Sequence, residues 1–109
     1  MAGQQPNMNQ MMKQVQQLQA EMVKAQEELA EEVVEGSAGG GMVSAKVSGQ
    51  LELRELTIAP EAVDPDDVEL LQDMVLAAVG QAFAAAKELQ ERKLGAATGG
   101  LGGLGLPGM

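Results

Sequence analysis

The sequence predicts an α+β fold made of a long helix, a three-stranded antiparallel sheet and a second long helix. Residues 42–48 alternate between apolar and polar side chains, as in a strand with one buried face. Two long segments with helical periodicity flank this region, and glycines and a proline separate them from it. We therefore expect the sheet to be the platform that holds both helices.

The first predicted helix covers residues 7–34 and follows a flexible N-terminus of residues 1–6. Asn7 is placed to cap it. At 1.5 Å per residue this helix is about 40 Å long, so about half of it should project beyond strands of roughly six or seven residues. Its apolar residues follow a coiled-coil seam, which we interpret as core against a partner helix: Met8, Met11, Val15, Leu18, Met22, Ala25 and Leu29.

Three strands are expected next. A short first strand covers residues 33–36, and the glycines at positions 39–41 form a tight turn after it. The second and third strands cover residues 42–48 and 51–58, and the turn at Gly49-Gln50 joins them into a hairpin. This order predicts an antiparallel sheet.

The apolar alternation slips within the third strand. Leu51 and Leu53 share one face, whereas Leu56 and Ile58 share the other. A β-bulge near Arg54-Glu55 would account for the slip. A strand covered on both faces at different points is the alternative, so the register of this strand stays open.

The second predicted helix covers residues 65–94, with Asp64 as its N-cap. Within residues 74–86 only Gly80 and Gln81 lack an apolar side chain, so the helix must be buried on more than one side. One small sheet covers one side, and the simplest second cover is the same helix of another copy. We therefore predict a homodimer, with these interface candidates: Met74, Ala77, Ala78 and Phe83.

Composition limits the function. The chain has 109 residues, the length of one domain, and it contains no cysteine, histidine, tryptophan or tyrosine. It therefore lacks the most common general base and the usual zinc ligands, which predicts no enzyme activity, no metal and no cofactor. No signal peptide is visible, and the longest apolar run is too short to cross a bilayer. These features predict a cytoplasmic protein with no membrane contact.

The charges are distributed unevenly. The net charge of −9 argues by itself against nucleic-acid binding, because phosphate contacts rely on Lys and Arg. Residues 1–20, however, contain no acid, and the end of the second helix is also mildly basic. If the helices are antiparallel, these ends meet at a projecting tip that could touch phosphates and groove edges. An ordinary solvated helix face is the alternative. The DNA-binding candidates are Lys13, Lys24, Lys87, Arg92 and Lys93.

Several segments carry a family resemblance over nearly the whole chain. They are residues 12–19 (MKQVQQLQ), 24–29 (KAQEEL), 45–49 (AKVSG), 58–61 (IAPE) and 73–79 (DMVLAAV), with GLPG near the end. In this order and spacing they resemble the YbaB/EbfC nucleoid-associated proteins. The resemblance implies a bacterial cytoplasmic homodimer whose paired helices project like tweezers.

The resemblance also implies that the protein binds duplex DNA in the nucleoid, with little sequence preference and with effects on gene expression. By position, the DNA contacts fall near Lys13 on the first helix and near Lys87, Arg92 and Lys93 on the second. So few cations predict weak, salt-sensitive binding. The alternative is an acidic protein-protein interaction module that does not bind DNA. Residues 7–94 form a single dimerisation and binding domain, and residues 95–109 a disordered Gly-rich tail.

Overall fold

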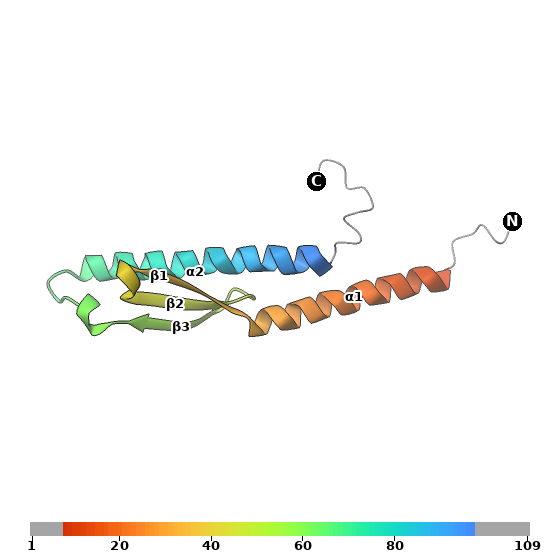
Figure 1. The fold of residues 1–109 in the computed structure, drawn as a ribbon, viewed down its shortest axis with the longest axis horizontal. Coiled ribbons are helices and arrows are strands. Elements are labelled where there is room, and N and C mark those ends of the chain that lie inside the picture. Colours follow the sequence, from red (N-terminus) through yellow and green to blue (C-terminus); the bar gives the residue numbers. More distant parts are fainter. Residues whose placement is uncertain (1–7, 98–109) are drawn as a thin grey trace, which may run out of the picture.

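Two long helices and a three-stranded sheet make up the computed structural model, which describes residues 8–97 (Figure 1). The strand order is β1-β2-β3, and both pairs are antiparallel. This architecture confirms the predicted α+β class. The predicted N-terminus and nearly all of the predicted tail lie outside the described residues. In chain order the helices and strands are α1 (Met8–Glu31), β1 (Val33–Ala38), β2 (Val43–Ser48), β3 (Leu53–Ile58) and α2 (Val68–Ala97).

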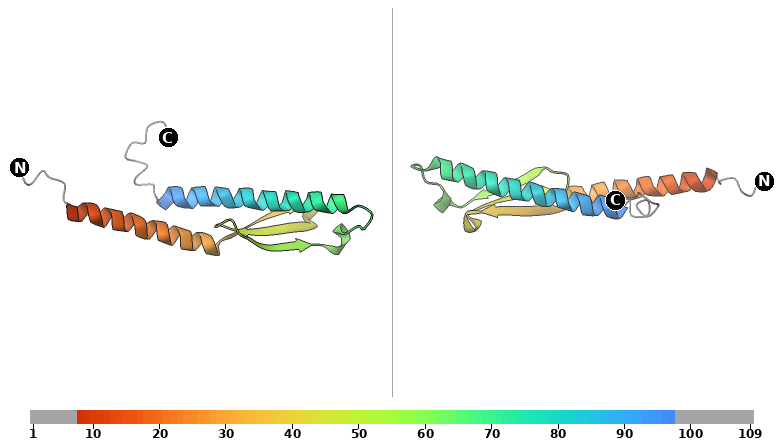
Figure 2. Two further views of the ribbon diagram at one scale, coloured as in Figure 1. Left: turned by 180° about the vertical axis from the view of Figure 1, so that it is seen from behind. Right: turned by 90° about the horizontal axis from the view of Figure 1, so that it is seen from above.

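α2 packs on one face of the sheet, over β1 and β2 (Figure 2). Its contact face is built of alanines one helical turn apart, which allow the helix to approach closely. The approach is tightest at Gly36, where a Cβ atom would collide with the backbone of α2 at Ala78 and Ala82. The buried core between α2 and β2 consists of Val43, Ala45, Val47, Ala78, Ala82 and Ala86.

β3 contains the predicted bulge. Lys46 pairs with Glu55, whereas the next residue of β2, Val47, pairs with Leu53. Arg54 is therefore the extra residue, and a bulge near Arg54-Glu55 is confirmed. Because the β2 partners of the β3 apolar residues face α2, the bulge places three of these residues on the α2 side of the sheet: Leu53, Leu56 and Ile58.

α1 projects from the end of the sheet and does not lie across it (Figures 1 and 2). Only its final turns contact the hairpin between β2 and β3. Leu29 is fully buried against Gly49, and the Gln50 side-chain amide donates a hydrogen bond of 3.2 Å to the Gln26 carbonyl oxygen. More than the predicted half of the helix therefore projects. The reason is that a single residue separates α1 from β1, which leaves no loop to fold the helix back.

α2 begins later than the sequence predicts. The Asp67 carboxylate accepts a hydrogen bond of 3.2 Å from the Leu70 amide and caps the helix. The Asp64 carboxylate instead accepts one of 2.9 Å from the Asp66 amide, two residues along the chain. The prediction that Asp64 is the N-cap was wrong, because its side chain closes a local turn before the helix begins.

α2 is long and apolar enough to cross a membrane by length and composition alone. The apolar run at residues 74–86 is too short to cross a bilayer, so the sequence predicted no membrane-spanning helix. The core helix of a folded domain can meet the same criterion, and the alanine face of α2 is buried on the sheet. Its outer side still exposes large apolar side chains, with Leu76 71% exposed and Leu70 51%. The sheet alone therefore does not cover this helix.

Candidate nucleic-acid interface

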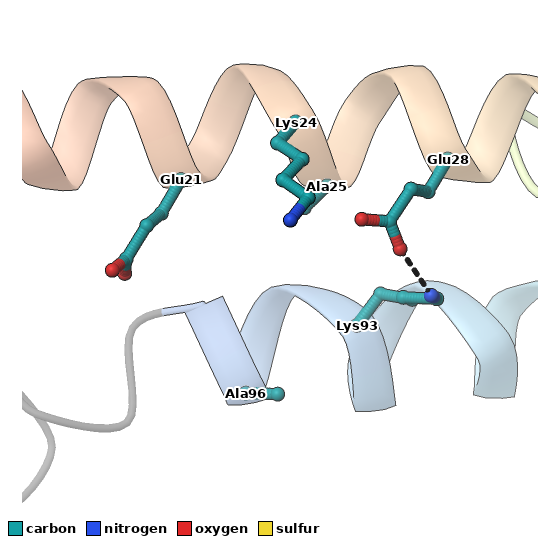
Figure 3. A pocket seen from close by; sticks show the side chains of 6 residues that line it. All are labelled: Glu21, Lys24, Ala25, Glu28, Lys93 and Ala96. Carbon is teal, nitrogen blue, oxygen red and sulfur yellow. Dashed lines mark hydrogen bonds and ion pairs between the residues drawn. The ribbon is translucent and has the colours of Figure 1, made fainter.

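The last turns of α2 lie against the middle of α1, and the two helices run in opposite directions (Figures 1 and 3). An open cleft of about 410 Å³ lies between them. α2 ends level with Glu21, so α1 continues alone beyond this point. Lys13 lies on that continuation, and the two basic helix ends therefore do not form one shared tip. The cleft is lined by Glu21, Lys24, Ala25, Glu28, Lys93 and Ala96.

Lys93 joins the two helices. Its ammonium nitrogen lies 2.6 Å from a carboxylate oxygen of Glu28 in α1 and 3.3 Å from a carboxylate oxygen of Glu32, the residue that follows α1 (Figure 3 shows the first contact). Glu28 and Glu32 are one turn apart, so they present two carboxylates to one cation. Lys93 is therefore engaged within the chain. Sequence reasoning missed both carboxylates, although Glu28 lies beside Ala25 and Leu29 on α1 and Glu32 follows one turn later at the end of the helix.

These contacts shift two pKa values. The hydrogen bond and charge of Lys93 lower the pKa of Glu28 below its ordinary value of 4.5, with a smaller contribution from Lys24. Hydrogen bonds from Glu28 and Glu32, with their charges, raise the pKa of Lys93 above 10.5. Partial burial opposes both shifts. Both shifts favour the charged forms of Glu28 and Lys93 in the neutral range.

The contact between α1 and α2 is expected to weaken at both ends of the pH scale. The contribution of Glu28 is present above pH 4.5 and is lost as the pH falls through its lowered pKa. That of Lys93 is present below pH 10.5 and is lost as the pH rises through its raised pKa. Hydrogen exchange of the α1 amides measures this: protection in the wild type should fall in both directions, and Lys93→Gln should remove the dependence. Identical pH profiles for the two proteins would contradict this role of Lys93.

The other four candidate cations are exposed and form no ion pair within residues 8–97. Lys13 and Lys24 are eleven residues apart, about three helical turns, so they lie on the same side of α1 and about 16 Å apart along it. Lys87 and Arg92 are five residues apart and point in different directions from α2. These four candidates thus form one row of two lysines and two separate cations.

The dimer-interface candidates divide into two groups. Ala78 is fully buried against the sheet within its own chain, whereas Met74 and Phe83 are half-buried and Ala77 is exposed. Sequence reasoning did not single out the most exposed apolar residue of α2, Leu76, although it lies in the same apolar run. The open apolar surface extends onto β3, because α2 covers only β1 and β2. The additional exposed residues are Leu53 and Leu56.

The cations and side-chain amides of the two helices are suited to binding a polyanion. Ammonium and guanidinium groups donate charge-assisted hydrogen bonds to phosphate, and the amides of α1 can contact phosphates or base edges. The acids lie elsewhere: the described part of α1 carries none before Glu21. Within residues 8–97 no three carboxylates, histidines or cysteines are grouped as a metal would require.

Comparison with known proteins agrees with this description. A protein of Helicobacter pylori described as uncharacterized has the same fold, with a TM-score of 0.71 at 22% identity, over 93% of this chain and 100% of that one. A nucleoid-associated protein of Saccharopolyspora erythraea is 56% identical, covering 98% of this chain and 97% of its own length. One of Streptomyces avermitilis is 54% identical, covering 98% and 95%. The family model described as the YbaB/EbfC DNA-binding family matches residues 4–101, and the chain belongs to this family.

Proposed function

We propose that this protein is a homodimeric, nucleoid-associated protein that binds duplex DNA with little sequence preference. The observation that carries the proposal is the projecting part of α1, which has no acid before Glu21 and carries Lys13, with Lys24 on the same side of the helix where the end of α2 reaches it. Membership of a family described as DNA-binding supports it. The protein would act in the bacterial cytoplasm, on the nucleoid, and its occupancy of DNA would affect gene expression.

Phosphate contacts would supply most of the affinity. Lys13 and Lys24 can contact phosphates along one strand, and Lys87 and Arg92 can add contacts from α2. Lys93 would act by holding α1 against α2, since its charge is already paired. The acidic sheet region would repel DNA and so confine it to the helices. Because phosphates carry no sequence information, the preference among sequences would be weak.

A homodimer would double this interface. The exposed apolar surface over α2 and β3 would be covered by the same surface of a second copy related by a two-fold axis. Two projecting helices then bind one duplex, and the second contact forms at a high effective concentration. The dimer thereby compensates for the small number of cations on each chain.

Leu76→Asp is expected to dissociate the dimer. Each copy would lose the burial of one leucine, about 2 kcal/mol, so the dimer dissociation constant should rise by about 10³-fold. Sedimentation equilibrium measures this change. Val33→Asp is the control, because Val33 is also exposed but lies on the sheet face away from α2. A Leu76→Asp protein that stays dimeric at the same concentration would refute this interface.

The DNA-binding proposal is tested by titrating a labelled duplex with the purified protein at two salt concentrations. Two lysines on each of two chains would make about four phosphate contacts, so the affinity should fall about 100-fold between 50 and 200 mM salt. Light scattering in both buffers checks that the assembly is unchanged. No binding at 50 mM would refute the proposal and favour an acidic protein-protein interaction module.

A further inference from the structure

α1 has an uncovered apolar face beyond the end of α2. The face that buries Ala25 and Leu29 continues towards the N-terminus at helical spacing, and α2 lies beside α1 only as far as Glu21. We call its uncovered part the methionine face. A groove of about 310 Å³ runs along it, and its four apolar residues are Met8 (73% exposed), Met11 (52%), Met12 (58%) and Val15 (53%).

The segment that follows α2 suits this face in charge and apolar content. Residues 98–109 read TGGLGGLGLPGM and contain no charged side chain. Leu101 and Leu104 are three residues apart, so an extended chain with three residues per turn presents both on one edge. The glycines between them add no bulk, and methionine side chains adapt readily to an irregular apolar partner.

The segment also has the required direction and length. α2 ends beside Glu21 and runs towards the N-terminal end of α1, so the chain can continue along α1 without reversing (Figures 1 and 3). From Glu21 to Met8 the helix rises about 20 Å. The twelve residues 98–109 span about 37 Å when extended at 3.1 Å per residue, which is enough to reach Met8.

We propose that residues 98–109 bind the methionine face of their own chain, with Leu101, Leu104 and Leu106 as the apolar anchors. The methionine face lies around α1 from the side that α2 contacts, so the segment would cross to it beyond Glu21. Attachment to α2 favours this occupant over free partners, because a short tether keeps the segment at a millimolar effective concentration.

This contact is separate from DNA binding. Lys13 follows Met11 by two residues, so it lies about 200° around the helix, on the opposite side of α1. The inference therefore does not rest on the proposed function. Its effect is to shield an apolar surface that would otherwise favour association with other proteins.

Methionine oxidation by hydrogen peroxide, followed by peptide mass spectrometry, tests the contact. The full chain is compared with a variant carrying Leu101→Ser, Leu104→Ser and Leu106→Ser. Since ordering a glycine-rich segment costs much conformational entropy, the contact is partly populated, and Met8, Met11 and Met12 should oxidise about three-fold faster in the variant. Met42 and Met74 pack against the sheet core and should oxidise equally in both proteins. Equal rates at the methionine face would overturn the proposal.

A second comparison shows whether the segment that covers the methionine face belongs to the same chain or to a second copy. The full chain is oxidised again at a dilution where light scattering shows monomers. Retained protection of Met11 and Met12 supports binding within one chain. Protection that disappears on dilution would overturn the proposal and assign the methionine face to a second copy.

Discussion

Gly36→Ala is expected to destabilise the protein by about 3 kcal/mol or more, the upper range for overpacking. Gly36 of β1 lies directly beneath α2, and an added Cβ atom would collide with the Ala78 carbonyl oxygen and the Ala82 amide nitrogen. These are backbone atoms, so no side-chain rotation can relieve the collision. α2 would have to lift away from the sheet, and the alanine-valine core would open.

Thermal unfolding followed by circular dichroism measures the loss. A change of this size should lower the melting temperature by on the order of 15 °C. Gly95→Ala is the matched control, because it makes the same substitution in α2 at a position where an added Cβ has no neighbour within 4 Å, away from Leu76. It should not destabilise the protein, since alanine favours a helix over glycine by up to about 1 kcal/mol. Melting temperatures that change equally in the two variants would contradict the proposed close approach.

Local patterns were sufficient to predict most of the fold. The alternation at residues 43–48 predicts β2 because valine and alanine on one face need cover, and α2 provides it. The slip of the leucines in β3 predicts the bulge because only an extra residue keeps both pairs on the covered side. In both cases the information lies within a few neighbouring residues.

Features that depend on distant residues were not predictable in the same way. Counting charges along the chain treats Lys93 as a free cation, but its partner Glu28 is 65 residues away. The angle of α1 depends on Leu29 packing against Gly49 of the hairpin, a contact that no sequence period indicates. Asp64 and Asp67 are both acceptable caps by residue type, and the turn before α2 decides between them.

Reversing the charge of both candidate lysines of α1, Lys13→Glu with Lys24→Glu, is expected to weaken duplex binding by on the order of 100-fold at 50 mM salt, because counterion release is lost. The dimer would lose about four phosphate contacts, so the negative slope of log affinity against log salt should become shallower by about 3.6. Fluorescence anisotropy at several salt concentrations measures both quantities.

Lys46→Glu is the matched control for this change. Lys46 pairs with Glu55 on the sheet face away from α2, so reversing its charge alters the net charge without touching the helices. Its effect on the salt slope should be close to zero. If Lys46→Glu weakened binding as much per charge as the α1 variant, affinity would depend on net charge alone. Since both variants make the chain more acidic, only a contact specific to α1 explains a difference between them.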